Sequence, residues 1–212
     1  REASQTEMEY QMRNWYYFTW LCGDHIVEQH IHNLDVMNWA KQGYPVRAQG
    51  MGGREVRDGL DHGEIFDHHF VEFHYADGTV MNSQCRHIKN CWNKVNETLI
   101  GTKGTADFGD GLLKSHKGKV ILKHDDTNDP NPYQVEHDEL FAAITNGEYN
   151  FADADNGAKS TMTSILGRMA TYSGKMITWD EAINSYINLL PDSWGWDVMP
   201  KTTPDEHGHY AI

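Results

Sequence analysis

Residues 65–88 alternate between apolar and polar side chains, and this pattern restricts the chain to folds that contain an antiparallel hairpin. The alternating stretches are IFDHHFVEFHY at 65–75 and TVMNSQCRHI at 79–88, joined by Ala-Asp-Gly at 76–78. A period of two is typical of half-buried strands, and Asp-Gly between two such stretches is a strong hairpin signal. Shorter strands are predicted at 98–100, 105–108 and 120–123, between glycine-bearing turns. The middle of the chain is therefore predicted to be a meander of antiparallel strands.

Four helices are predicted around these strands, at 24–42, 135–146, 154–173 and 178–190. Asp24 suits the N-cap of the first helix, and Thr178 with Glu181 forms a capping box at the start of the last. The third helix is small and apolar nearly all round, so it should be largely buried. This order predicts an α+β domain with an open, mainly antiparallel sheet and helices packed on one face.

Length and composition define the expected organisation. The chain has 212 residues, which we interpret as one domain over residues 1–190 followed by an extended arm, 191–212, with three prolines and no period. The counts of 18 basic and 31 acidic residues give a net charge of −13, which repels a phosphate backbone, so no nucleic-acid partner is expected. No stretch approaches the ~20 apolar residues of a membrane span, which favours a soluble protein, cytoplasmic or periplasmic.

The most informative polar feature is a stripe along the predicted helix 24–42. At 100° per residue, His25, Glu28, His32 and Asp35 share one side, opposite the apolar face. Glu28 and His32 are four residues apart, so the carboxylate can orient the imidazole as a general acid/base pair. A solvated helix face explains the same spacing. A metal site of His25, Glu28 and His32 is a weaker third interpretation, because no fourth ligand is evident, and no metal is predicted. His30 points to the apolar side and is interpreted as a hydrogen-bonded core histidine.

The hairpin carries a second group of polar residues. His68 and His69 must face opposite sides of the sheet. Asp67, His69, Glu72 or His74, and Arg86 form a candidate lining for a sugar-sized polar cavity, although a solvated sheet face accounts for them equally well. No glycine-rich dinucleotide fingerprint, P-loop or nucleophile elbow is present, since GMGGR at 50–54 does not fit GxGxxG. The chain therefore carries no recognisable nucleotide-binding motif.

Five segments together resemble the C-terminal domain of the Gfo/Idh/MocA oxidoreductases: FTWLCGDHIVEQHIHNLDVMNW, GMGGR, DHHFVEFHYADGTVMNSQCRHI, GTKGTADF and NGAKSTMTSILGRMATYSGKMITWDEA. The resemblance covers nearly the whole chain and is strongest to the branch common in Bacteroidetes and Planctomycetes. It implies a fold like the C-terminal domain of glyceraldehyde-3-phosphate dehydrogenase. It also implies that an N-terminal Rossmann domain, which binds NAD or NADP, is missing, so we expect a partial family member.

The resemblance also implies roles for individual residues. The family pattern of Asp, then His four residues later, then Asp three beyond, falls on Glu28, His32 and Asp35. His32 would transfer the proton of the substrate hydroxyl, with Glu28 as its acidic neighbour, whereas the partner lysine belongs to the missing domain. We assign substrate contacts to His25, Asp35, His69 and Arg86. Asp24 stands where many members have glycine.

The expected function is the substrate-binding half of an NAD(P)-dependent oxidoreductase that acts on a sugar, cyclitol or glycoside hydroxyl, or of a glycosidase that uses the same transient oxidation. In the family this sheet commonly pairs between subunits, so the resemblance implies a homo-oligomer. The alternative is a stand-alone carbohydrate-binding or oligomerisation domain without redox activity. The missing nucleotide motif favours this alternative, whereas the Glu28/His32 pair favours the enzyme.

Overall fold

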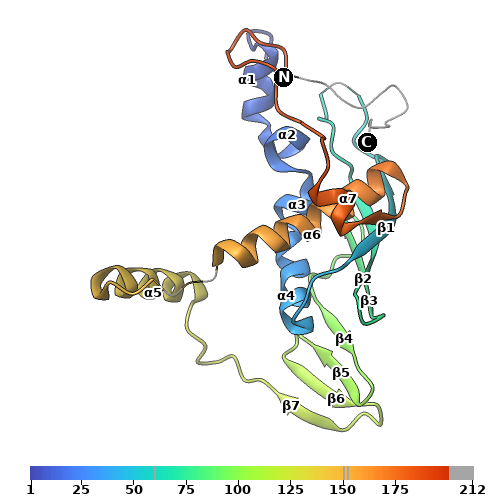
Figure 1. Ribbon diagram of the computed structural model, residues 1–212, viewed down its shortest axis with the longest axis vertical. Coiled ribbons are helices and arrows are strands. Elements are labelled where there is room, and N and C mark those ends of the chain that lie inside the picture. The colour runs from blue at the N-terminus through green and yellow to red at the C-terminus, as the bar shows by residue number, and fades with distance from the viewer. Residues whose placement is uncertain (60, 150, 152, 201–212) are drawn as a thin grey trace. The chain divides into compact units, whose positions relative to one another are not determined.

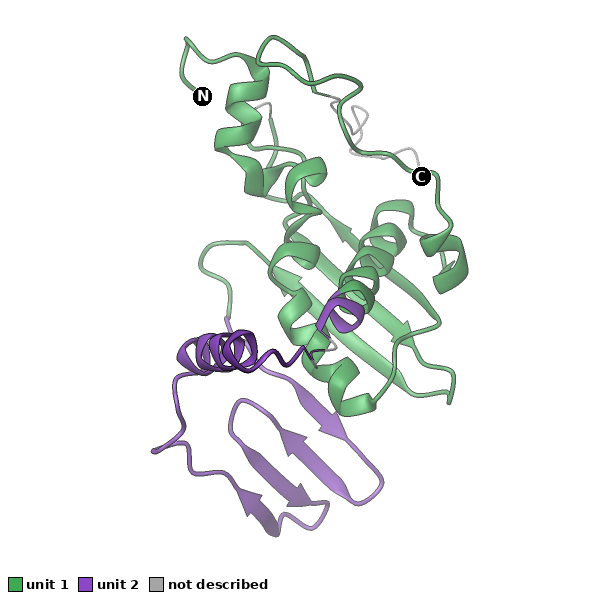
Figure 2. Cartoon of the chain, turned by 60° about the vertical axis from the view of Figure 1, so that its left-hand side comes forward, with its two compact units in different colours: residues 1–92, 158–212 green, residues 93–157 purple. Residues whose placement is uncertain are grey.

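The computed structural model describes residues 1–59, 61–149, 151 and 153–200. The chain forms two compact units, one of residues 1–92 together with the chain from 158 onward, and the other of residues 93–157 (Figure 2). The predicted domain of residues 1–190 thus comprises two compact units, and its extent as a folding domain stays a prediction. Most of the predicted arm, residues 201–212, lies outside the described residues.

The first unit is built on a four-stranded sheet in the order β3-β2-β1-β8, with every neighbouring pair antiparallel. The strands are β1 (Arg47–Gly53), β2 (His68–His74), β3 (Val80–Arg86) and β8 (Ile177–Thr178). Helices α3 (His25–Glu28), α4 (Ile31–Lys41) and α6 (Asp153–Ser173) supply the apolar residues that cover one face of this sheet (Figure 1). The predicted α+β architecture is therefore confirmed.

The hairpin forms in the predicted place, and its alternation shows in the burial of its side chains. In β2, His69, Val71 and Phe73 are buried, whereas their neighbours in sequence are only partly buried. In the core, Val71 and Phe73 pack against Ile26 of α3 and Leu166 of α6. At Gly167 a Cβ would lie 2.7 Å from the Phe73 ring, so glycine is what allows α6 to approach the sheet this closely.

The N-terminal segment contains three short helices that the sequence analysis did not predict: α1 (Glu7–Arg13), the 3-10 helix η1 (Trp15–Tyr17) and α2 (Thr19–Cys22). A capping box between Thr6 and Glu9 starts α1. The predicted capping box of Thr178 and Glu181 is confirmed, but its helix α7 (Trp179–Ile183) ends well before residue 190. Residues 184–190 are largely exposed and have little core to pack against, which explains the early end.

The second unit holds a separate antiparallel sheet in the order β4-β5-β6-β7 and the helix α5 (Pro132–Asn146). Its strands are β4 (Thr98–Ile100), β5 (Gly104–Asp107), β6 (Leu112–Ser115) and β7 (Val120–Lys123). Three of these strands and the helix were predicted, whereas β6 was not.

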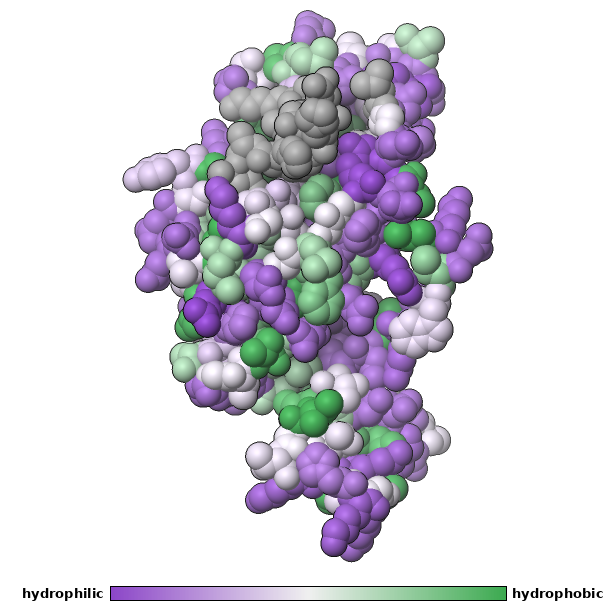
Figure 3. Space-filling view, turned by 90° about the vertical axis from the view of Figure 1, so that its right-hand side faces the viewer, coloured by the Kyte–Doolittle hydropathy of each residue, from purple (hydrophilic) through white to green (hydrophobic). Residues whose placement is uncertain are grey.

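The molecular face drawn in Figure 3 carries mainly hydrophilic residues, with hydrophobic side chains in small separate patches. No helix in the described part of the chain is both long enough and apolar enough to cross a membrane.

Candidate active site

The segment predicted as one helix over 24–42 contains a widened turn. The helix is interrupted at Gln29 and His30, between α3 and α4. There the carbonyl of His25 accepts hydrogen bonds from the backbone N–H groups of both Gln29 (3.1 Å) and His30 (3.0 Å). The second of these spans five residues, as in a π-turn, a feature frequent at functional sites. The prediction of one continuous helix was therefore wrong at the turn that joins Glu28 to His32.

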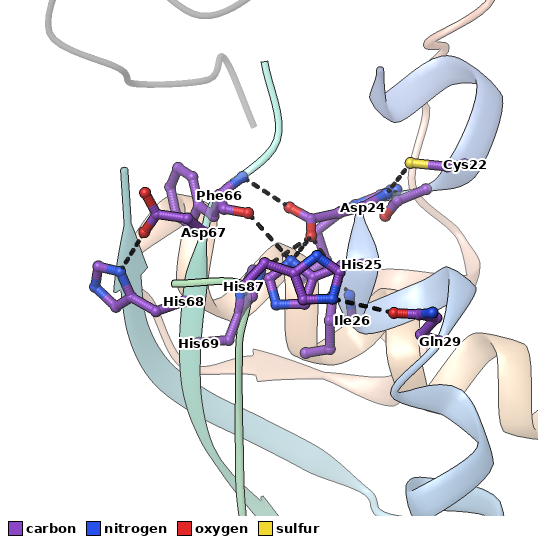
Figure 4. Close-up of polar contacts among 12 residues, drawn as sticks. Cys22, Asp24, His25, Ile26, Gln29, Phe66, Asp67, His68, His69 and His87 are labelled. Carbon is purple, nitrogen blue, oxygen red and sulfur yellow. Dashed lines mark hydrogen bonds and ion pairs between the residues drawn. The ribbon is translucent and has the colours of Figure 1, made fainter. Parts of the chain in front are cut away.

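Asp24 lies at the centre of a buried cluster that joins four parts of the first unit. Its Oδ1 lies 2.9 Å from Nδ1 of His25 and 3.2 Å from Nε2 of His69. Its Oδ2 accepts hydrogen bonds from the backbone N–H of Phe66 (3.1 Å) and from the hydroxyl of Tyr172. Burial opposes ionisation of Asp24, but His69 and the hydrogen bonds from both histidines outweigh it and hold its pKa well below the ordinary value. We name these five residues the Asp24 cluster; Figure 4 labels Asp24, His25, Phe66 and His69.

The backbone at Asp24 is strained. Its φ of 83° and ψ of 158° lie in a region that essentially only glycine adopts at little cost. Such strain costs about 1–3 kcal/mol, so the bonds of the carboxylate must offset it. This conformation gives a physical reason for the glycine that the family resemblance places at this position.

The hydrogen bonds of the Asp24 cluster assign the tautomers of its histidines. Nδ1 of His25 faces two acceptors, Oδ1 of Asp24 and the carbonyl of Phe66 at 3.1 Å, so it carries the proton. Nε2 of His25 is buried without a hydrogen-bond partner among the described residues. Burial lowers the pKa of His69, although Asp24 opposes the shift, and Nε2 of His69 donates to Oδ1 of Asp24.

A second set of polar contacts fixes the widened turn. The Oε1 of Gln29 accepts hydrogen bonds from the hydroxyl of Tyr16 (2.7 Å) and from Nε2 of His87 (3.0 Å). The His87 ring stacks between Tyr16, at 5.4 Å, and His25, at 4.7 Å. Figure 4 shows the rings of His25 and His87 beside each other. Burial, followed by the influence of His25 and Arg57, lowers the pKa of His87 to about 4, so this ring is neutral near pH 7. Tyr16 and His87 thus clamp Gln29 between the two candidate catalytic residues.

The two candidate catalytic residues lie on either side of this turn. Glu28 ends α3 and is half-buried, and its Oε2 is buried without a hydrogen-bond partner among the described residues. His32 is exposed in the first turn of α4. No hydrogen bond joins the side chains of Glu28 and His32 in the part of the chain that is described, so their pairing stays a prediction.

The four predicted substrate-binding residues do not gather in one place. His25 and His69 are 1% and 3% exposed within the Asp24 cluster. Both side chains are buried in this conformation, and their contact with a substrate stays a prediction. Asp35 accepts a hydrogen bond from the hydroxyl of Ser160. Arg86 is exposed at the end of β3 and donates to the carbonyl of Trp92 at 2.7 Å.

The predicted polar cavity over the hairpin does not form from the proposed residues. His69 faces the helices, whereas Glu72 and His74 point to the other side of β2. Asp67 is buried, and its Oδ2 accepts hydrogen bonds from three successive backbone N–H groups, at 55–57. The sheet therefore separates the residues that the sequence grouped together. The hydrogen bond predicted for His30 is present, to Ser83 at 2.7 Å, but the side chain is only partly buried.

Asp24, His25 and His69 also offer the one group of potential metal ligands found among the described residues, with ligand atoms within 4.8 Å of one another. Hydrogen bonds within the Asp24 cluster already occupy these atoms, so the arrangement needs no ion to explain it. The described strands pair only antiparallel, whereas a dinucleotide fold needs parallel strands joined by helices. The residues present therefore do not form a nucleotide site of this kind.

No protein-family model and no curated protein matches the sequence. Solved structures match in fold. The myo-inositol 2-dehydrogenase of Lactobacillus plantarum matches with a TM-score of 0.57 at 17% identity, over 72% of this chain and 48% of that one. The scyllo-inositol dehydrogenase of Lactobacillus casei, solved with NAD(H) and scyllo-inositol, matches with a TM-score of 0.54 at 16% identity, over 71% and 47%.

A levoglucosan dehydrogenase, in complex with NADH and levoglucosan, matches with a TM-score of 0.59 at 11% identity, over 77% of this chain and 53% of that one. The chain spans about half the length of the matched structures. At these identities the comparisons establish the fold alone. This chain therefore shares the fold of about half of each of these sugar and inositol dehydrogenases.

Proposed function

We propose that this chain is the substrate-binding half of a Gfo/Idh/MocA-type NAD(P)-dependent oxidoreductase that acts on a hydroxyl group of a sugar, cyclitol or glycoside. One observation carries the proposal. In a fold shared with inositol and levoglucosan dehydrogenases, a π-type turn separates Glu28 from His32, and side-chain hydrogen bonds clamp that turn. A turn held in this way on a rigid scaffold is what the positioning of an acid/base pair requires.

His32 is the proposed proton-transfer residue. It is exposed, as a group that meets a substrate must be, and an imidazole can both accept and donate a proton. Glu28 is the proposed acidic neighbour, because its Oε2 has no hydrogen-bond partner among the described residues and can accept a hydrogen bond from the imidazole or from a substrate hydroxyl. Asp35 and Arg86 remain the proposed substrate contacts.

NAD or NADP would be bound by a separate nucleotide-binding domain, since the described residues form no dinucleotide fold. When bound there, the nicotinamide would accept the hydride from the carbon whose hydroxyl loses its proton. We also propose that the product is either a ketone or a cleaved glycoside, and that the open face of the β3-β2-β1-β8 sheet joins a second copy. The exposure of Met51 (69%) and Val80 (45%) supports a contact there.

The test begins with the intact mass of the natural polypeptide that carries this chain. That polypeptide, or this chain together with a separately encoded partner, is then incubated with NAD or NADP and a panel of sugars and cyclitols. Formation of reduced nicotinamide is followed. His32→Ala should lower kcat by about 10²–10⁴-fold while nucleotide affinity stays unchanged, because general acid/base catalysis contributes that much.

His137→Ala is the matched control, since it removes an exposed histidine from α5 in the other unit. Its kcat should equal that of the parent. Sugar binding without nicotinamide reduction by any member of the panel would instead support a carbohydrate-binding domain. Equal kcat in His32→Ala and the parent would remove His32 from the mechanism.

A further inference from the structure

Arg57 is a cation that forms no ion pair with any described residue of this acidic chain. Basic residues number 18 against 31 acidic ones, yet none of the ion pairs among the described residues includes Arg57. Its Nε is buried and has no hydrogen-bond partner in the described part of the chain. Buried donors are nearly always paired in folded proteins, so a buried N–H without an acceptor among the described residues needs an explanation.

The loop that carries Arg57 is fixed in place by a buried carboxylate. Oδ2 of Asp67 accepts hydrogen bonds from the backbone N–H groups of Glu55 (2.7 Å), Val56 (2.7 Å) and Arg57 (3.1 Å), and Asp67 is fully buried. The carbonyl of Arg57 also accepts a hydrogen bond from Nε of Arg54, at 2.5 Å. The backbone under the Arg57 side chain is therefore held at several points.

The guanidinium of Arg57 rests on an aromatic ring that is itself fixed. Its Cζ lies 4.4 Å from the centroid of the Tyr17 ring. Gly63 packs against Tyr17 so closely that a Cβ at Gly63 would lie 2.4 Å from the Tyr17 Cβ. The carbonyl of Tyr17 accepts the backbone N–H of Glu64 at 2.8 Å. Arg57 is thus oriented in advance rather than free in solvent.

Arg57 lies beside the clamp that holds the candidate active site. Tyr17 contacts Tyr16 edge to face at 5.4 Å, and Tyr16 bonds to Gln29, the residue after Glu28. The charge of Arg57 also influences the neighbouring His87. Because His87 is neutral near pH 7, Arg57 provides the positive charge on this side of the clamp.

We propose that Arg57 binds an oxyanion of the substrate, so that the substrate is an acidic sugar that carries a carboxylate, phosphate or sulfate group. The guanidinium fork matches two oxygens of such a group, and a guanidinium fixed in advance loses little freedom on binding. The inference rests on the proposed function in one respect, namely that the bound molecule is a substrate. Binding of an anion by Arg57 can be tested on this chain alone.

The experiment titrates the full chain with D-glucuronate, D-glucose 6-phosphate, inorganic phosphate and D-glucose, using calorimetry and the NMR signal of the Arg57 Nε–H. At least one sugar anion should bind more tightly than D-glucose and shift that signal. Arg57→Met, which keeps the aliphatic stem over Tyr17, should weaken anion binding by about 10- to 100-fold and leave D-glucose binding unchanged. Arg57→Lys should retain part of the preference because it keeps the charge without the fork.

Arg47→Met is the matched control, since Arg47 is an exposed arginine on β1 of the same unit. Its anion preference should equal that of the parent. The source of the oxyanion follows from which probe binds: glucuronate indicates a sugar acid, and glucose 6-phosphate with inorganic phosphate as competitor indicates a phosphate ester. Equal binding of all four probes, or a preference that survives in Arg57→Met, would overturn the inference.

These assays need no nicotinamide, so the two proposals can fail separately. Loss of the anion preference removes Arg57 from substrate recognition and leaves the redox proposal standing. An anion preference in a polypeptide that never reduces nicotinamide would retain Arg57 as an anion site in a binding domain.

Discussion

Replacing Asp24 separates the cost of its backbone strain from the contribution of its carboxylate. Asp24→Ala leaves the donors on His25, His69, Phe66 and Tyr172 without their buried acceptor and keeps the strained φ of 83°. Breaking a buried, paired charge costs about 3–5 kcal/mol. Typical domains have about 5–15 kcal/mol of stability in total, so this loss should be easy to measure.

Asp24→Gly removes the same carboxylate but adopts the required backbone conformation without strain. It should recover about 1–3 kcal/mol relative to Asp24→Ala, less the ~0.5–1 kcal/mol that glycine loses in conformational entropy on folding. The assay is urea unfolding followed by tryptophan fluorescence, with the free energies of unfolding compared at a common slope. A cost below about 1 kcal/mol for Asp24→Ala would refute the role of the carboxylate, because that is less than one ordinary buried polar group contributes. Asp24→Gly no more stable than Asp24→Ala would refute the strain.

Three further predictions concern neighbouring residues. Burial, with a smaller contribution from His25, lowers the pKa of His30 from 6.5 to about 4. The unfolded chain therefore binds a proton at His30 before the folded chain does as the pH falls. The contribution of neutral His30 to the free energy of unfolding is complete above about pH 6.5 and should be lost toward pH 4, by up to about 1.4 kcal/mol per pH unit. Urea unfolding across that range should show this slope in the parent and not in His30→Gln. Tyr16→Phe deletes one of two donors to Gln29 and should lower kcat of the complete enzyme more than it raises KM, whereas an unchanged kcat would mean that the clamp does not position the pair. Gly167→Ala should cost about 1–3 kcal/mol by differential scanning calorimetry, because its Cβ meets the Phe73 ring at 2.7 Å, and a neutral result would show that the core can expand there.

The parts of the fold that the sequence predicted are those decided over short range. The hairpin around Val71 and Phe73 follows from a local period of two and its Asp-Gly turn, and the capping box at Thr178 follows from two residues three apart. The strand β1 was missed because RAQGMGG has no alternation. It becomes a strand because β2 and β8 supply hydrogen-bond partners on both of its sides.

The site was harder to predict because its contacts join distant residues. Asp24 meets Phe66 and Tyr172, which lie 42 and 148 positions further along the chain. Helical spacing placed Glu28 and His32 on one stripe, but it could not show that the carbonyl of His25 accepts two N–H groups and interrupts the helix between them. The one available signal was the aspartate at a position where the family pattern has glycine. A polar residue at a site that favours glycine indicates that its side chain has a buried partner.

The first unit is interrupted in sequence by the second, and this has a consequence for the order of folding. Three of the four strands of the sheet that contains Phe73 precede residue 87, but Leu166 and Met169 of α6, which cover that sheet, follow the whole segment 93–157. During synthesis the ribosome must therefore extend the chain through that segment before α6 can bury the apolar face of the hairpin. Until then the part of this face that α6 covers is open to chaperones and to aggregation. Closing so long a loop is also expected to make docking of α6 a late, slow step in refolding.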